Sequence, residues 1–230
     1  MRVFQLKGRL TALLFLSLIL LLTGCQPPSS VIPPPPNERE IIGTIETMQG
    51  AGVTVAGRPA RQSMPIYEGE EVKTGAGSTV IIRFSRGGLM QLRENTDPIF
   101  TIMRESMCLL IRMFYGHAML DSGGQCVNAD TPESGAFINT KVDIRVEGGR
   151  TVFEVLEGRI EVAAKARPQQ RTSVTSGQTV VVSSSMVEPA RPLTQRELRD
   201  LNARFLQIRE IRAPDPPRGL TPPSDIRIIR

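Results

Sequence analysis

The sequence has few of the side chains on which most catalytic and metal sites depend. Its 230 residues include one histidine, three cysteines, two tyrosines and no tryptophan. A single histidine excludes a metal site built from several histidines, and three cysteines exclude a disulfide-dense miniprotein. Sites that stack sugar rings on tryptophan or tyrosine are disfavoured by the same shortage. A packed core is still expected, because 40% of the residues are hydrophobic.

Residues 1–24 have the pattern of a cleaved export signal. Arg2, Lys7 and Arg9 precede an apolar stretch at residues 10–22. That stretch is shorter than the roughly 20 residues that a membrane-spanning helix needs. It therefore predicts the hydrophobic region of a signal peptide.

The apolar stretch ends in the sequence Leu-Thr-Gly-Cys at residues 22–25. This sequence resembles the lipobox of bacterial lipoproteins, whose cysteine is diacylated and becomes the mature N-terminus. The resemblance implies lipidation at Cys25 and anchoring to a membrane through the lipid chains. The alternative is an ordinary signal peptide with an incidental cysteine. Gln26, rather than an aspartate, follows the cysteine, which is similar to Gram-negative lipoproteins sorted to the outer membrane. We therefore expect the protein to face the periplasm.

Residues 25–40 are rich in proline, with four consecutive prolines at residues 33–36. Such a run favours extended polyproline II. We expect a lipidated linker that holds the following domain away from the membrane. The alternative is a proline-rich ligand for a recognition module.

Residues 41–190 show a spacing of apolar residues near two, with glycines between the short segments. The strands expected from this spacing are 41–45, 53–55, 79–84, 89–93, 108–113, 118–120, 142–146, 151–156, 159–163 and 179–182. The pattern predicts an all-β domain, either a β-sandwich or a solenoid-like roll of short strands. No helical pattern intervenes between the strands, which argues against a parallel α/β sheet.

Four motifs in this region follow one another in a characteristic order. They are EGEEVKTGAGSTV at 68–80, IRFSRGGLMQLRENT at 82–96, TVFEVLEGRIEV at 151–162 and SGQTVVV at 176–182. Together they resemble the FecR domain, and the resemblance implies a FecR-like β fold. In the third motif, Gly158 is predicted to form a tight turn between two strands of a hairpin. FecR regulators proper carry a cytoplasmic anti-sigma segment and a membrane-spanning helix. We expect neither here, so the resemblance implies the domain rather than sigma-factor control.

Two cysteines remain once Cys25 is assigned to lipidation. Cys108 and Cys126 form an even pair in a chain expected to be exported, and the periplasm is oxidising. We expect a disulfide between them, spanning a hairpin around residues 115–117. The alternative is two unpaired cysteines in the core.

No catalytic, cofactor or metal site is predicted. A nucleophile activated by histidine would have to use His117, which we expect to be an exposed residue in a turn. Glu70 with Glu71, and Glu154 with Glu157, could serve glycoside hydrolysis, which makes an envelope hydrolase a weaker hypothesis. Such carboxylates are far more often solvated. No glycine-rich loop leads into a helix to hold phosphate, and no small-molecule substrate is evident.

The C-terminal region has a different pattern. Thr194 and Glu197 match a capping box, and apolar residues then recur at spacings of three and four. The pattern predicts an amphipathic helix within residues 193–212 whose apolar face packs on the β domain. A docking face for another protein is the alternative. Residues 213–230 are expected to be a proline-rich basic tail.

The formal charge of +5 is concentrated at the two ends of the chain. Residues 191–230 carry nine arginines and five acidic residues, whereas residues 25–190 have a net charge of −2. The basic balance therefore gives no support for nucleic-acid binding in an exported protein. We expect a non-enzymatic interaction or sensory module that binds an envelope protein or polymer. The alternative is a structural envelope lipoprotein that binds peptidoglycan or polysaccharide without signalling.

Overall fold

The structure is a computed structural model that describes residues 39–210. Within this range the chain forms strands β1 to β18 and then helix α2 (Gln195–Glu210). The predicted all-β class with one C-terminal helix is confirmed. The predicted signal peptide, most of the proline-rich linker and the basic tail lie outside the described residues. No helix in residues 39–210 combines the length and the apolar character needed to cross a membrane.

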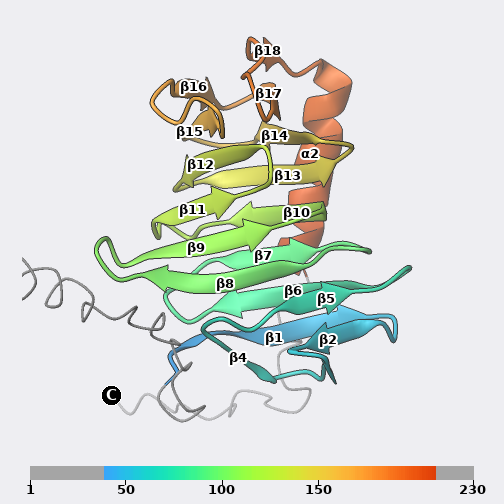
Figure 1. Cartoon of the computed structure of the whole chain (residues 1–230). Coiled ribbons are helices and arrows are strands. Elements are labelled where there is room, and N and C mark those ends of the chain that lie inside the picture. Colours follow the sequence, from blue (N-terminus) through green and yellow to red (C-terminus); the bar gives the residue numbers. More distant parts are fainter. Residues whose placement is uncertain (1–38, 211–230) are drawn as a thin grey trace, which may run out of the picture. The chain divides into compact units, whose positions relative to one another are not determined.

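The strands form three sheets (Figure 1). The nine-stranded sheet has the order β18-β17-β14-β13-β10-β7-β6-β1-β4, with bounds Arg191–Pro192, Gln178–Ser183, Arg150–Val155, Lys141–Glu147, Gly116–Asp121, Leu89–Leu92, Thr79–Phe84, Ile41–Gln49 and Pro65–Tyr67. The six-stranded sheet has the order β16-β15-β12-β11-β9-β8, with bounds Thr172–Thr175, Arg159–Ala164, Ser134–Ile138, Val127–Asp130, Cys108–Met113 and Pro98–Met103. The small sheet has the order β3-β2-β5, with bounds Arg58–Pro59, Val53–Val55 and Val72–Thr74.

In Figure 1 the strands lie one above another, from β1 and β4 at the bottom to β18 at the top, and the chain alternates between two layers of strands along this direction. The β6–β7 hairpin lies in the nine-stranded sheet, the β8–β9 hairpin in the six-stranded sheet, and β10 returns to the first. Because β10 has left their sheet, β9 and β11 become neighbours and run parallel. A bridge between Glu71 and Ile99 links the small sheet to the edge of the six-stranded sheet. This layered roll is the sandwich-like arrangement that the strand spacing predicts.

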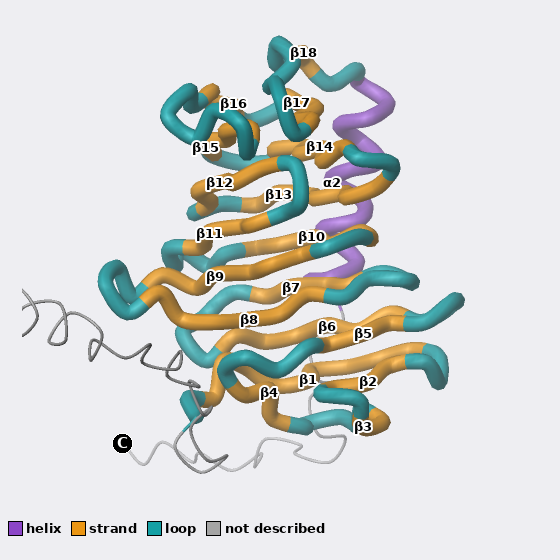
Figure 2. The backbone as a smooth tube through the Cα atoms, in the orientation of Figure 1, coloured by secondary structure: helices purple, strands orange, loops and turns teal. Residues whose placement is uncertain are grey.

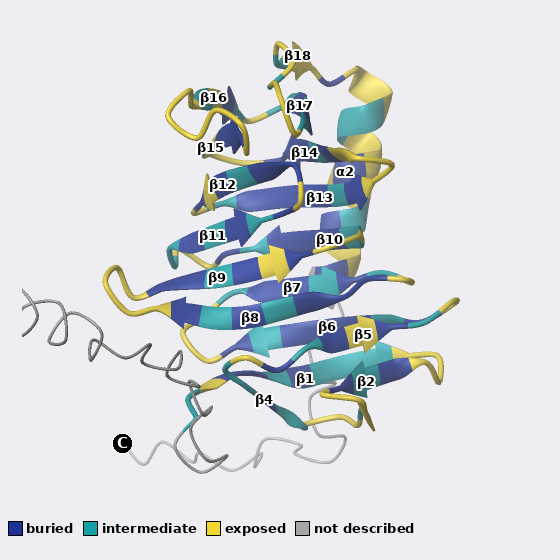
Figure 3. Cartoon of the chain, in the orientation of Figure 1, coloured by how far each residue is buried: buried dark blue, intermediate teal, exposed yellow. Residues whose placement is uncertain are grey.

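The main core lies between the two layers. Along β6, Val80, Ile82 and Phe84 are buried, whereas Thr79 and Arg83 are partly exposed. Figure 3 shows the same mixture of buried and exposed residues along the other strands. The rings of Phe84 and Phe100 meet edge to face with centroids 5.7 Å apart. Burying each such side chain contributes about 1.5–3 kcal/mol of hydrophobic free energy.

A second, smaller core lies between helix α2 and the outer face of the nine-stranded sheet. Figure 2 shows the helix crossing the strands rather than following them. The buried side chains of this core are Ile81, Leu89, Met119, Leu156, Leu193, Leu201, Phe205 and Ile208. The helix begins with the predicted capping box: the Thr194 N–H donates to Glu197 Oε2 at 2.7 Å, and the Glu197 N–H donates to Thr194 Oγ1 at 3.3 Å. The apolar face of the helix thus packs on the β domain.

The predicted hairpin around Gly158 is wrong in one respect. Gly158 has a φ of +70°, and a Cβ atom there would lie 2.5 Å from the Thr140 Oγ1 atom. The turn therefore requires glycine, as predicted. However, β14 belongs to the nine-stranded sheet and β15 to the six-stranded sheet. The turn carries the chain from one layer to the other and does not pair the two strands.

Candidate functional site

The single histidine lies in a strand, and its prediction as an exposed turn residue is wrong. His117 belongs to β10, and its side chain is only 21% exposed. Its Nε2 atom lies 2.9 Å from each carboxylate oxygen of Asp143, which is fully buried. Arg204 of helix α2 donates from Nη1 to the same carboxylate at 2.6 Å. A cation from the helix and an imidazole from the sheet therefore share one buried acid.

Arg204 also joins a second carboxylate. Its Nη2 atom donates to Glu154 Oε2 at 3.0 Å, and Arg145 pairs with the other oxygen of Glu154. A buried carboxylate is tolerated only when it is paired and hydrogen-bonded. The five residues, which we call the helix anchor, hold α2 against the sheet at a defined position.

The other carboxylates considered for hydrolysis also have cationic partners. Glu70 accepts from Arg58 Nη2 at 3.1 Å and from the Tyr67 N–H at 3.0 Å. Glu71 pairs with Lys73, and Glu157 pairs with Lys141. Across residues 39–210, no group of three histidine, cysteine, aspartate or glutamate side chains is placed to hold a metal ion.

Cys108 and Cys126 form a disulfide with their Cα atoms 4.8 Å apart. Cys108 opens β9, and Cys126 precedes β11, the parallel neighbour of β9. The Leu109 N–H donates to the Cys126 carbonyl at 3.0 Å. The expected hairpin between the two cysteines is therefore wrong, because β9 and β10 lie in different sheets. The bridge ties together the starts of two parallel strands.

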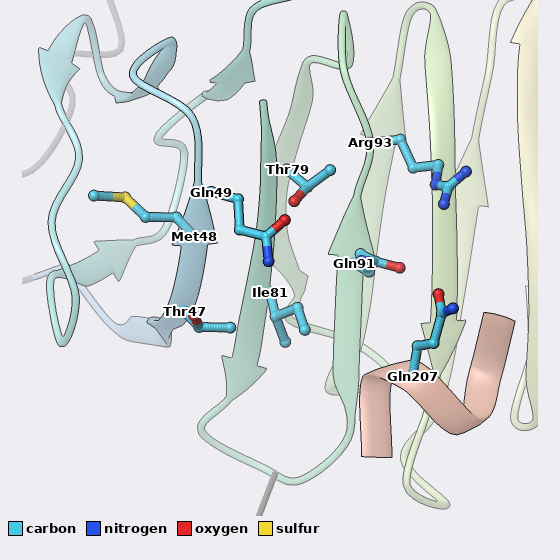
Figure 4. Close-up of a pocket in the computed structure, with 8 residues that line it drawn as sticks. All are labelled: Thr47, Met48, Gln49, Thr79, Ile81, Gln91, Arg93 and Gln207. Atoms are coloured by element: carbon cyan, nitrogen blue, oxygen red, sulfur yellow. The ribbon is translucent and has the colours of Figure 1, made fainter. Parts of the chain in front are cut away.

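A polar groove of about 470 Å³ lies on the outer face of the nine-stranded sheet (Figure 4). Its lining residues are Thr47, Met48, Gln49, Thr79, Ile81, Gln91, Arg93 and Gln207. They come from β1, β6, β7 with the residue that follows it, and helix α2. Figure 4 shows the side chain of Gln207 rising from the helix toward Gln91 and Arg93. The groove therefore presents amides, hydroxyls and one guanidinium.

Arg93 is the charged residue of this groove. Its backbone N–H donates to the His117 carbonyl at 2.9 Å, which continues the pairing of β7 with β10. Its Nε atom is buried and has no hydrogen-bond partner within residues 39–210. A buried guanidinium nitrogen without an acceptor carries a free-energy cost. Because this Nε atom is closed to solvent, an acceptor in the groove would remove that cost only when the Arg93 side chain turns toward it.

An apolar hollow of about 560 Å³ lies on the outer face of the six-stranded sheet. Its floor includes Leu110 of β9, Gly135 and Phe137 of β12, and Ala163 of β15. Strand β11 lies between β9 and β12 and contributes Asn128 and Ala129. Phe137 is 38% exposed. A Cβ atom at Gly135 would meet nothing within 4 Å, so the hollow is open above this glycine.

The charges around the apolar hollow neutralise one another. Asp130 pairs with both Lys165 and Arg112, and Arg171 pairs with Glu161 at 3.2 Å. The hollow therefore combines an apolar floor with a polar rim, which is the anatomy of protein-interaction sites.

Sequence reasoning identified neither the groove nor the hollow. Phe137 and Gly135 lie in β12, a strand that the apolar spacing did not reveal. The expected strand at 89–93 places Leu89, Gln91 and Arg93 on one face, because alternate residues of a strand point the same way. It could not show that Gln207 of a distant helix joins them.

Comparison with known proteins assigns neither a family nor a function. No protein-family model matches the chain, and no curated protein matches it by sequence. Two crystal structures of a putative anti-sigma factor from Parabacteroides distasonis are similar in part, each with 15% identity and a TM-score of 0.47. The aligned parts cover 56% and 60% of this chain, and 62% and 64% of those chains, which is less than two thirds of their length. The FecR resemblance stays a prediction.

Proposed function

We propose that this protein is a lipid-anchored envelope protein whose FecR-like domain is a non-enzymatic protein-interaction module. Cys25 would carry the lipid, and the domain would face the periplasm from the outer membrane. The partner would be an envelope protein that docks on the apolar hollow through bulky apolar side chains.

The outer face of the six-stranded sheet, which no helix covers within residues 39–210, carries this proposal. Helix α2 covers part of the outer face of the nine-stranded sheet, whereas Phe137 and Leu110 of the other sheet line an open hollow. An apolar floor inside a polar rim suits an apolar anchor side chain from a partner. Within residues 39–210 the rim charges pair with each other, so a charged ligand would have to compete with these pairs.

A non-enzymatic role is supported by the state of the carboxylates. Glu70 and Glu154 each accept from arginine side chains. A general acid or base must exchange its proton with a substrate, and these carboxylates are occupied by structural ion pairs.

A substitution that fills the hollow tests the proposal. Gly135→Leu places a side chain into open space at a position whose φ is not in the left-handed region, so the fold should persist. The full chain and the variant would be expressed in the envelope, cross-linked and purified. We expect the variant to lose its cross-linked protein partner. Ala203→Leu, on the exposed face of α2 far from the hollow, should retain it.

Two outcomes would contradict the proposal. One is an unchanged set of partners in Gly135→Leu. The other is recovery of peptidoglycan or polysaccharide alone, which would favour the structural alternative. Mass spectrometry of the mature N-terminus would separately show whether Cys25 is diacylated.

A further inference from the structure

The polar groove faces away from the apolar hollow, on the other sheet, and its chemistry is different. We propose that it is a second binding site, which takes a polypeptide segment bearing a carboxylate side chain, with Arg93 as the residue that recognises the carboxylate. This inference does not depend on the proposed function, because the two sites share no residue.

The unsatisfied guanidinium is the first reason. Several arginines on this domain have an acidic partner, such as Arg83 with Glu46 at 2.6 Å, and the ion pairs described within residues 39–210 include none for Arg93. Arg93 has a buried Nε without an acceptor. Guanidinium groups present donors in a fixed fork that matches a carboxylate with two parallel hydrogen bonds. Arg93 lines the groove, so a carboxylate bound there would give this guanidinium the acidic partner that it lacks among residues 39–210, with the side chain turning to present Nε.

The neighbouring side chains indicate what surrounds that carboxylate. Strand register places Ile81 opposite both Thr47 and Gln91, and Gln49 opposite Thr79. Directly opposed side chains on one face lie about 5 Å apart. Each glutamine amide offers both donors and an acceptor, which is the complement of a peptide group.

A peptide fits this lining better than a sugar does. None of the lining residues is aromatic, so the groove has no platform on which a sugar ring could stack. Gln207 adds an amide from the exposed surface of α2, at the end of the groove opposite Thr47 and Gln49 (Figure 4).

The helix anchor determines whether the groove is complete. Arg204, three residues before Gln207, is held by Asp143 and Glu154. Residues three apart lie on the same side of a helix. Docking of α2 therefore brings Gln207 to the groove.

Nuclear magnetic resonance on the purified full chain can test the site directly. The probes are a capped alanine-rich tetrapeptide with one glutamate, the same peptide with glutamine in its place, and an oligomer of galacturonic acid. We expect the glutamate peptide to shift the Arg93 Nε–H signal and the side-chain amides of Gln91 and Gln207. We expect it to bind at least tenfold more tightly than the glutamine peptide.

Variants separate recognition from folding. Arg93→Gln should abolish the preference for glutamate over glutamine, whereas Arg199→Gln, on the exposed face of α2, should leave it unchanged. If Arg93→Gln does not fold, Gln207→Ala on the helix surface still tests the site. This variant should weaken binding of the glutamate peptide at least threefold.

Three results would overturn the inference. They are an unshifted Arg93 Nε–H signal at millimolar glutamate peptide, equal affinity for the two peptides, and tighter binding of the galacturonate oligomer. The last result would identify a site for acidic polysaccharide instead.

Discussion

Removing the guanidinium of Arg204 tests how helix α2 is held on the sheet. Arg204→Met keeps most of the aliphatic stem, which packs against the sheet, and deletes both hydrogen-bonded contacts to Asp143 and Glu154. The variant therefore isolates the charge from the packing.

The expected cost follows from the burial of the partners. Removing one member of a fully buried pair costs about 3–5 kcal/mol, whereas an exposed pair contributes about 0–1 kcal/mol. The side chain of Arg204 is 22% exposed. In the variant, Asp143 would still contact His117, and Glu154 would still pair with Arg145. We therefore expect a loss of about 2 kcal/mol in the free energy of unfolding. For a domain of this size, this lowers Tm by about 4–8 °C.

Two assays measure this loss. Urea unfolding of the full chain gives the global free energy, and hydrogen exchange shows whether α2 opens before the sheets do. Arg199→Met, on the exposed face of the same helix, is the control and should change stability by less than 0.5 kcal/mol. A double-mutant cycle of Arg204→Met with Glu154→Gln should show a coupling energy of about 1 kcal/mol or more. If Arg204→Met behaved like the control in both assays, the helix anchor would not hold the helix.

Further predictions concern the layer-crossing turn, the disulfide and the helix cap. Gly158→Val should lower the free energy of unfolding by about 1–3 kcal/mol, because it forces a β-branched residue to positive φ beside Thr140; an unchanged melting temperature would refute the turn geometry. Replacing Cys108 and Cys126 by alanine should cost about 3 kcal/mol in thermal or urea unfolding, since the bridge closes a loop with a sequence separation of 18; equal stability of the oxidised and reduced chains would contradict this. The hydrogen bonds from Arg191 and Thr194 lower the pKa of Glu197 from 4.5 to about 2. This carboxylate should therefore stabilise α2 fully above pH 4.5 and lose its effect as the pH falls toward 2. In hydrogen exchange of α2, Glu197→Gln should remove that part of the acid dependence. The same acid profile in both proteins would contradict the prediction.

Strands with strong alternation could be predicted, and those with few apolar residues could not. The strands at 79–84 and 108–113 match β6 and β9. In contrast, β11 reads Val-Asn-Ala-Asp and β16 reads Thr-Ser-Val-Thr, so each buries too few apolar side chains to show a period. Strand β8 starts at Pro98, a residue that more often marks a turn or an edge. The apolar hollow could not be predicted because β11 and β12 were not.

Local glycines indicated turns correctly but not where the turns lead. A glycine at positive φ permits either a reversal of the chain within one sheet or a connection to the other layer. Gly158 lies in a connection between the layers, from β14 to β15. The position of His117 shows the same limit. Gly116 beside it suggested a turn, whereas its partner Asp143 lies 26 residues away in the sequence. The other partner of Asp143, Arg204, lies a further 61 residues along the chain. Contacts of this range depend on strand order, which the sequence pattern does not specify.

In the proposed function, the outer face of the six-stranded sheet receives a protein partner. A photoreactive amino acid placed at Phe137 in the full chain, and separately at the exposed Leu206 of α2, tests it most directly in the intact envelope. We predict that illumination cross-links the Phe137 position to one defined protein, that Gly135→Leu abolishes this product, and that the Leu206 position does not yield it. The same product from both positions, or none from Phe137, would contradict the account.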